Sequence, residues 1–163
     1  MFEKFGEFDS VEELNKAAVG FKSENDTESI LELAKENGID EDDAQDYIDG
    51  VNTEFATLSM AAFGRIDLER KEEIKDASGK MAMEVIFAMI MTIIMEEDIQ
   101  EGIMKKGKRA KDILSGIRQE ASKHKSGNMG VSCGTDKQLK DIIRTYYTKS
   151  REAFETKIAE LYR

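Results

Sequence analysis

Apolar side chains recur at intervals of three and four residues along most of this 163-residue chain. Such spacing places them on one face of a helix and is typical of amphipathic helices that pack together. Proline is absent and strand-like alternation is scarce. The pattern therefore predicts an all-α fold, a compact single-domain bundle of about six to seven helices.

Capping residues mark the first two predicted helices. Ser10 and Glu13 form a capping box at the start of an apolar stripe that begins at Val11. Asp26 opens a second helix, which Asn37-Gly38 ends as a left-handed C-cap.

Two further helices are expected before the middle of the chain. The acidic run Asp40-Glu41-Asp42-Asp43 predicts the start of the third helix, and Gly50 predicts its end. We expect Asn52 or Thr53 to cap the fourth helix, which carries Phe55 on its apolar side.

The middle of the chain contains an uncharged apolar run of 11 residues, 85–95. A membrane span needs about 20 apolar residues, so we expect no membrane segment. A helix that is apolar on all sides is typical of the middle of a bundle. We therefore expect a central hydrophobic helix over residues 76–104. The first residues also lack the pattern of a secretory signal, which predicts a cytoplasmic protein.

The C-terminal part predicts two amphipathic helices separated by a loop. The first follows Gly107 and turns Ala110, Ile113 and Ile117 inward. Residues 126–134 are rich in glycine and form the expected loop. Thr135 or Asp136 caps a last helix whose apolar stripe continues to the C-terminus.

Charge is distributed unevenly over the chain. Its formal net charge is −10, yet residues 1–54 hold 17 acidic and 4 basic side chains while residues 105–163 hold 7 and 15. We expect residues 1–64 to form an acidic N-terminal helical subdomain. Residues 65–163 then contain the central apolar helix and the basic C-terminal helices, within one continuous globular unit.

Residues 30–48 have the skeleton of a helix-turn-helix, but the second helix carries carboxylates that DNA would repel. The segment does not fit a calcium-binding EF-hand loop either. Such a loop needs glycine at its sixth position and glutamate at its twelfth, and counted from Asp40 these positions are Gln45 and Val51. Two interpretations remain for this segment: a solvated acidic face that complements its helix dipole, or a surface that imitates DNA phosphates and binds a basic groove. The candidate partner-binding residues are Asp40, Glu41, Asp42, Asp43, Asp46 and Asp49.

A basic cluster near the start of the C-terminal part is the alternative site. It consists of Lys105, Lys106, Lys108, Arg109 and Lys111, with further support from Lys123, Lys125, Lys137 and Lys140. This cluster suits contacts with nucleic-acid phosphates, pairing with the acidic half of the same or a second chain, or plain solvation at a helix start.

Catalytic and metal chemistry have little support. The chain has a single cysteine, Cys133, and a single histidine, His124, so a disulfide framework and a histidine-rich or cysteine-based metal site are excluded. A Cys133–His124 nucleophile pair has no oxyanion site marked beside it. We expect no enzyme activity, no cofactor and no metal.

Several stretches together resemble one family of small proteins. The matching motifs include Phe5-Gly6-Glu7-Phe8-Asp9-Ser10, Asp26-Thr27-Glu28-Ser29, residues 33–50, Met60-Ala61-Ala62-Phe63-Gly64, Lys106-Gly107-Lys108 and Ile142-Ile143-Arg144-Thr145-Tyr146-Tyr147. They resemble the PcfK-like proteins of conjugative elements, including the relatives described as Cas9-inhibiting anti-CRISPR proteins. The likeness covers most of residues 5–147 and is strongest over 5–64.

This resemblance implies a non-enzymatic protein of a phage or conjugative element, acting in the bacterial host cell. It would bind a Cas9-type nuclease loaded with its guide RNA and block target-DNA binding or cleavage. A compact acidic helical domain is suited to occupy such a basic channel. The alternative function is a nucleic-acid-binding accessory factor that acts through the basic half. We also expect a homodimer, formed by head-to-tail charge pairing or by the Met-rich apolar helix.

Overall fold

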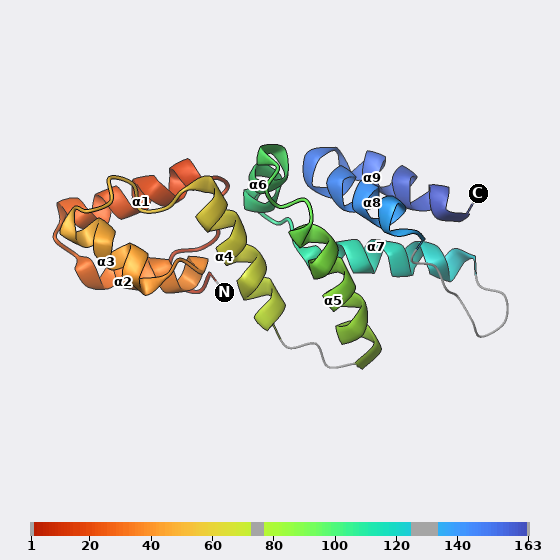
Figure 1. Cartoon of the computed structure of the whole chain (residues 1–163), viewed down its shortest axis with the longest axis horizontal. Helices are drawn as coiled ribbons and strands as arrows, with labels where there is room; N and C mark the ends of the chain where they lie inside the picture. Colours follow the sequence, from red (N-terminus) through yellow and green to blue (C-terminus); the bar gives the residue numbers. More distant parts are fainter. Residues whose placement is uncertain (1, 73–76, 125–133, 163) are drawn as a thin grey trace. The chain divides into compact units, whose positions relative to one another are not determined.

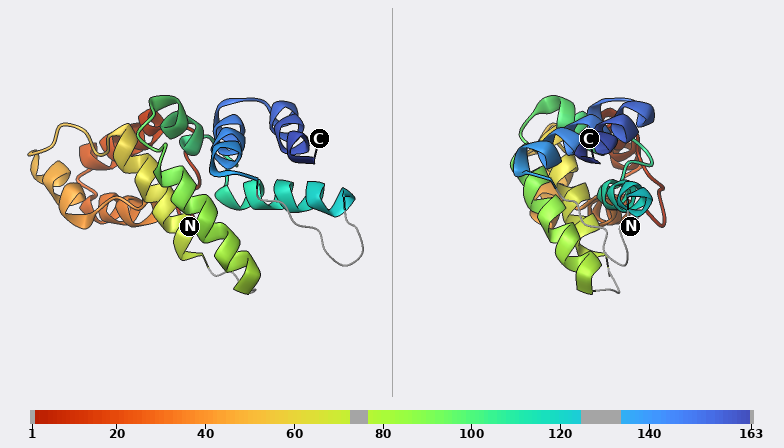
Figure 2. Two further views of the ribbon diagram at one scale, coloured as in Figure 1. Left: turned by 45° about the vertical axis from the view of Figure 1, so that its right-hand side comes forward. Right: turned by 90° about the vertical axis from the view of Figure 1, so that its right-hand side faces the viewer.

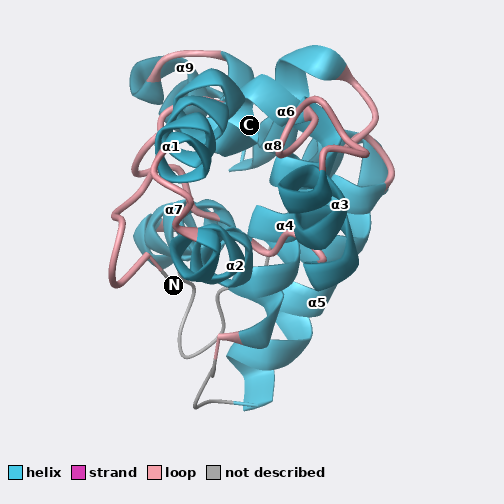
Figure 3. Cartoon of the chain, turned by 90° about the vertical axis from the view of Figure 1, so that its left-hand side faces the viewer, coloured by secondary structure: helices cyan, strands magenta, loops and turns pink. Residues whose placement is uncertain are grey.

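The computed structural model describes residues 2–72, 77–124 and 134–162. These residues form helices joined by turns and loops, and none of them lies in a strand (Figure 3). The predicted all-α class is confirmed. The predicted number of helices is wrong, because the described residues form nine α-helices and a short final 3₁₀ helix.

The chain divides into two compact units. Unit 1 consists of residues 1–71 and 103–107, and unit 2 consists of residues 72–102 and 108–163. The sequence-based division at residue 64 falls inside the helix α4 (Leu58–Lys71). A short piece of chain from the middle of the sequence, 103–107, thus completes the N-terminal unit.

Unit 1 contains α1 (Val11–Ser23), α2 (Thr27–Asn37), α3 (Glu41–Asp49) and α4, which Figure 1 shows in red to yellow. The predicted caps of α1 and α2 are confirmed: Ser10 accepts a hydrogen bond from the Glu13 N–H, and Asp26 accepts one from the Ser29 N–H. Gly38 ends α2 with a φ of +67°.

The predicted start of α4 at Asn52 or Thr53 is wrong. The helix begins at Leu58, and the Thr57 hydroxyl accepts the Met60 N–H. The preceding loop is not helical, and it buries the side chain of Phe55, which is 1% exposed, in the core of unit 1. The Asn15 side chain donates to the Ala56 carbonyl oxygen and accepts the Ala56 N–H, and these two hydrogen bonds replace those of a helical turn.

A buried arginine ties together three segments of unit 1. Arg65 of α4 is 1% exposed, and its guanidinium donates to the carbonyl oxygens of Phe8, Ile103 and Met104 at 2.8, 3.1 and 2.7 Å. It also pairs with the carboxylate of Glu7 at 3.3 Å. These contacts fix both the N-terminal segment and residues 103–104 to α4, and they satisfy a charge that would be costly to bury alone.

Unit 2 contains α5 (Ala77–Met91), the first part of α6 (Glu97–Met104), α7 (Ala110–Lys123), α8 (Asp136–Thr148), α9 (Arg151–Ala159) and the 3₁₀ helix η1 (Glu160–Tyr162). Helices α7, α8 and α9 lie side by side, as the two views of Figure 2 show. Ala110, Ile113 and Ile117 face the core of this unit, which confirms their predicted inward side.

The last helix does not run unbroken to the C-terminus. Thr135 caps the start of α8 in a complete capping box with Gln138. The helix ends at Thr148, because the backbone of Lys149 is extended. Ser150 then caps α9 by accepting the Ala153 N–H. Serine at this position competes for backbone hydrogen bonds and so favours a new helix start over continuation.

The predicted central hydrophobic helix over 76–104 is not formed. Helix α5 ends at Met91, residues 92–95 make a turn, and α6 starts at Glu97. Only one side of α5 faces the core, because Met81 is 73% exposed while Met83 is 3% exposed. No helix in the described part of the chain is long and apolar enough to cross a membrane. The predicted loop 126–134 lies almost wholly outside the described residues.

Candidate functional site

The net charge of the protein resides in unit 1. This unit holds 19 acidic and 9 basic side chains, a formal net charge of −10, whereas unit 2 holds 15 of each. A partner that is attracted by negative charge will therefore be drawn to unit 1.

Helix α3 presents the densest group of these acids. It is a short helix because both of its ends are set by the sequence: Asp40 caps its start and Gly50, with a φ of +81°, ends it. Glu41, Asp42 and Asp43 occupy its first turn, where negative charge is favourable to the helix dipole.

Three aspartates share the outer face of α3. Asp42, Asp46 and Asp49 are spaced by four and three residues, which places their side chains in one row along a helix. All three are exposed, as are Asp40 and Glu41, whereas Asp43 lies at the half-buried edge. We call Asp42, Asp46 and Asp49 the acidic row.

None of the six acids at positions 40–49 has a basic side chain within 4.0 Å among the residues that the structure describes. Within the described residues, the side-chain hydrogen bonds of these acids are local: Asp40 accepts the Asp42 N–H, and Asp49 accepts from the amide of Gln45 at 3.0 Å. The acidic row is thus open to an external cation.

The inner face of α3 anchors the row to the core. Tyr47 is 3% exposed and packs edge-on against Phe55, with ring centroids 5.6 Å apart. The ammonium of Lys22 lies 4.2 Å from the Tyr47 ring centroid and donates to the Tyr47 carbonyl oxygen near the end of α3. Burial raises the pKa of the Tyr47 hydroxyl, so this ring stays neutral at physiological pH. These contacts hold α3, and with it the exposed carboxylates, against the core of unit 1.

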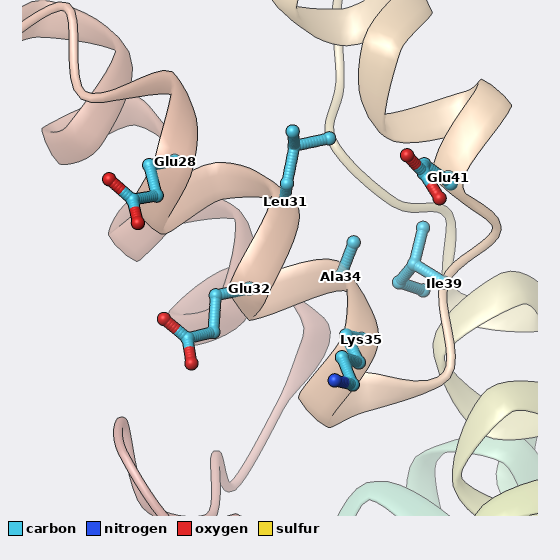
Figure 4. Close-up of a pocket in the computed structure, with 7 residues that line it drawn as sticks. All are labelled: Glu28, Leu31, Glu32, Ala34, Lys35, Ile39 and Glu41. Carbon is cyan, nitrogen blue, oxygen red and sulfur yellow. The ribbon is translucent and has the colours of Figure 1, made fainter.

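A shallow groove of about 500 Å³ opens next to α3, along α2 and the turn that joins the two helices (Figure 4). Its apolar lining consists of Leu31, Ala34 and Ile39, and Lys35 of α2 lines it as well. In Figure 4, Glu28 and Glu32 lie on one side of this apolar lining and Glu41 lies on the other. Such a groove suits the aliphatic stem of a lysine or arginine whose charged head reaches the carboxylates at the rim.

One rim carboxylate is already paired. Lys4 of the N-terminal segment contacts Glu32 at 2.5 Å, and this hydrogen bond raises the pKa of the lysine. The backbone N–H groups of Lys4 and Phe5 donate to Glu36 on the same helix. Glu28 and Glu41 make no comparable contact in the described chain and remain open to a ligand.

The predicted basic cluster is engaged in contacts within the chain. Lys105 lies 3.9 Å from Asp9, Lys111 lies 3.4 Å from Glu72, and the Arg109 N–H donates to the Tyr146 hydroxyl. The Lys108 ammonium lies 4.6 Å from the Tyr146 ring centroid and donates to the Tyr146 carbonyl.

Burial of this ammonium lowers the pKa of Lys108. Lys106 has an exposed side chain, while its backbone N–H donates to Asp9. Among the supporting lysines, Lys123 pairs with Glu120 at 2.6 Å, Lys137 is exposed and Lys140 is half-buried. Lys125 lies outside the described residues.

Of the two residues considered for catalysis, the structure describes only His124. The His124 ring stacks on the Tyr162 ring, with centroids 4.5 Å apart, and contacts the carboxylate of Glu120. Hydrogen bonds from Lys123 and then from His124 hold the pKa of the Glu120 carboxyl below its usual value. Cys133 lies outside the described residues. No group of three metal-ligating side chains occurs within the described ranges.

The sequence predicted the acids of α3 as candidate partner-binding residues, and that role stays a prediction; it gave no prediction of the groove beside them. The spacing of Glu28 and Glu32 on the outer side of α2 was a usable signal, because residues four apart share a helix face. Ile39 was harder to assign, since its place in the apolar lining depends on how the turn after Gly38 folds back. Comparisons with protein-family models, with curated proteins and with solved structures found no match to this chain.

Proposed function

We propose that the protein is an inhibitor that binds a Cas9-type nuclease loaded with its guide RNA. In this proposal the acidic row of α3 occupies the basic channel that the nuclease keeps for nucleic acid, and target-DNA binding or cleavage is blocked. Asp40, Glu41 and Asp43 supply further negative charge at the same helix. The activity requires binding alone and no catalytic residue.

The observation that supports this proposal is the row of exposed carboxylates, which has no basic partner among the residues that the structure describes. Successive members lie about one helical turn apart, at roughly 6 and 4.5 Å along the helix axis, so a partner meets a series of closely spaced negative charges. An acidic face that served only to stabilise its own helix would need charge in the first turn alone. Asp46 and Asp49 lie beyond that turn.

The choice of a Cas9-type partner in this proposal rests on the resemblance to PcfK-like proteins and is supported by the negative charge of unit 1. Cas9-type nucleases hold nucleic acid in a positively charged channel that reads the backbone. Complementary potentials speed association and exclude wrong partners. The groove beside α3 adds a place for one basic side chain of such a channel.

Inhibition of target cleavage by the purified protein tests the proposal. Reversing the acidic row in the triple variant Asp42→Lys, Asp46→Lys and Asp49→Lys should weaken inhibition at least about tenfold. A matched control reverses three exposed acids elsewhere, Glu3, Glu24 and Glu101, and changes the net charge equally.

The control variant should inhibit nearly as well as the wild type, because its acidic row is intact. Circular dichroism verifies that both variants remain helical. Undisturbed cleavage by a panel of Cas9 orthologues at large molar excess of the wild-type protein contradicts the proposal.

A further inference from the structure

The groove beside α3 combines an apolar lining with carboxylates at its edges. Ala34 and Ile39 are 2% and 6% exposed, and Leu31 is half-buried. Glu28 and Glu41 are exposed on opposite sides of these three residues (Figure 4). This combination fits a side chain that has an apolar stem and a cationic head.

The charge of the groove favours a basic occupant. Its lining contains three carboxylates and one ammonium, that of Lys35, which leaves a net charge of −2. Neither Glu28 nor Glu41 has a basic side chain within 4.0 Å in the part of the chain that the structure describes. A neutral or anionic segment would give these carboxylates no counter-charge, whereas an arginine or a lysine supplies one.

The chain itself places one cation at this rim. The Lys4 ammonium pairs with Glu32 at 2.5 Å. This hydrogen bond, together with the negative charges of Glu32 and Glu28, raises the pKa of Lys4. The rim carboxylates of α2 therefore stabilise a cation in the folded protein.

The Lys4 side chain can leave this position without release of the N-terminal segment. Both partners of the Lys4–Glu32 pair are nearly half exposed, at 48% and 44%, and exposed ion pairs contribute little to stability. The backbone holds the segment, because the N–H groups of Lys4 and Phe5 donate to Glu36 at 2.6 and 3.2 Å. The Phe5 ring also packs against the Phe21 ring, with centroids 5.2 Å apart. A ligand that displaces the ammonium thus leaves the fold intact.

We propose that the groove binds an arginine side chain of the partner protein, in competition with Lys4 for the carboxylate of Glu32. The aliphatic stem of this arginine lies on the apolar lining, and its guanidinium reaches the carboxylates at the rim. Arginine is preferred to lysine because its planar guanidinium carries five N–H donors and bonds two carboxylates at once. Glu28 and Glu32, four residues apart on α2, offer such a pair. The identity of the partner rests on the proposed function, while the site itself does not.

Two-dimensional NMR of the isotope-labelled protein locates the site, with N-acetyl-arginine amide as the ligand at low salt. Shifts of backbone amides should concentrate on residues 28–41 and on Lys4. They should saturate at roughly millimolar ligand, as expected of so small a molecule. N-acetyl-citrulline amide has the same length without the charge, and it should bind at least about threefold more weakly.

Neutralisation of the competing cation and of the rim should change the affinity in opposite directions. Lys4→Gln releases Glu32 and should tighten binding of N-acetyl-arginine amide about twofold to fivefold. The double variant Glu28→Gln and Glu41→Gln should weaken it by a similar factor.

Matched controls separate these effects from the overall charge of unit 1. Lys16→Gln removes an exposed lysine of α1, and the double variant Glu24→Gln and Glu54→Gln removes two exposed acids of the same unit. Both controls should bind the ligand nearly as the wild type does.

The outcomes separate this site from the proposed function. Shifts confined to the acidic row, equal binding of the citrulline compound, or an unchanged affinity of Lys4→Gln each overturn the arginine site. Arginine binding in the groove of a protein that leaves Cas9-type nucleases uninhibited supports the site and contradicts the proposed function. Inhibition of the nuclease without arginine binding in the groove does the reverse.

Discussion

Gly38, at the end of α2, and Gly64, inside α4, meet backbone to backbone. A Cβ atom on Gly64 would lie 2.6 Å from the Gly38 carbonyl oxygen, and a Cβ atom on Gly38 would lie 2.5 Å from the Gly64 carbonyl oxygen. Gly38 also has a φ of +67°, which side chains disfavour. The turn after α2 can therefore rest directly on α4. Since α3 follows this turn, the contact sets the position of the acidic row.

Gly64→Ala should destabilise the protein by about 2–4 kcal/mol, because backbone atoms on the opposite side cannot move aside as a flexible side chain can. Urea unfolding followed by circular dichroism measures the change. Gly20→Ala is the matched control, since Gly20 lies in α1 with nothing within 4 Å of an added Cβ. It should stabilise the protein by about 0.5–1 kcal/mol. Equal stability of the two variants would show that the close contact has no energetic role.

Arg65→Met should cost about 3–5 kcal/mol, because it removes the buried donor to the carbonyl oxygens of Phe8, Ile103 and Met104 and the ion-pair partner of Glu7. Lys71→Met on the same helix serves as the comparison. Lys71 pairs with Asp67 at the surface, where both side chains are more than half exposed, and its loss should cost less than about 1 kcal/mol. Urea unfolding measures the loss of stability in both variants. Similar losses for Arg65→Met and Lys71→Met would refute the role assigned to Arg65.

Asp26→Ala should lower stability more at neutral pH than in acid. Hydrogen bonds from the Ser29 hydroxyl and backbone N–H hold the pKa of the Asp26 carboxyl below its usual value in the folded protein. The stabilisation is complete above the ordinary carboxyl pKa and disappears as the pH falls through the lowered folded-state pKa. Thermal unfolding at pH 7 and at successively lower pH follows the loss. The wild type and the variant should converge in acid, whereas a constant difference in melting temperature would contradict the cap.

Short duplex DNA should not be shifted by micromolar protein in a low-salt mobility assay. The net negative charge of unit 1 opposes DNA binding, and two cations of the basic cluster, Lys108 and Lys111, contact Tyr146 and Glu72. Phosphate binding that weakens steeply with salt would instead support the nucleic-acid-binding alternative. Lys106→Ala, which removes an exposed cation, would then reduce the shift.

Local signals in the sequence predicted much of the fold. Ser10, Asp26, Thr135 and the glycines at 38 and 50 act on neighbouring backbone groups, so their caps could be assigned without knowledge of the tertiary structure. The sequence-based prediction was wrong where contacts between residues far apart in the sequence determine the local structure. The loop before α4 is held by Asn15, forty-one residues away from Ala56, and no local pattern shows this bond.

The central apolar run shows why periodicity alone misplaced a helix. Residues 77–91 are apolar on two opposite faces, and this pattern fits both a helix buried on all sides and a helix with one covered and one open face. The acids of α3 were found from sequence because surface charge needs no partner to be recognised. Arg65 was missed because its role depends on carbonyl groups supplied by residues 8, 103 and 104.

Competition between the protein and target DNA for a guide-loaded Cas9-type nuclease tests the central claim most directly. The dissociation constant of the protein is measured by titration against the immobilised complex, with and without saturating target duplex. The acidic row predicts that target DNA weakens binding of the wild type at least about tenfold and that the triple variant of Asp42, Asp46 and Asp49 fails to bind. Failure of the wild type to bind, or equal affinity of wild type and variant, would contradict it.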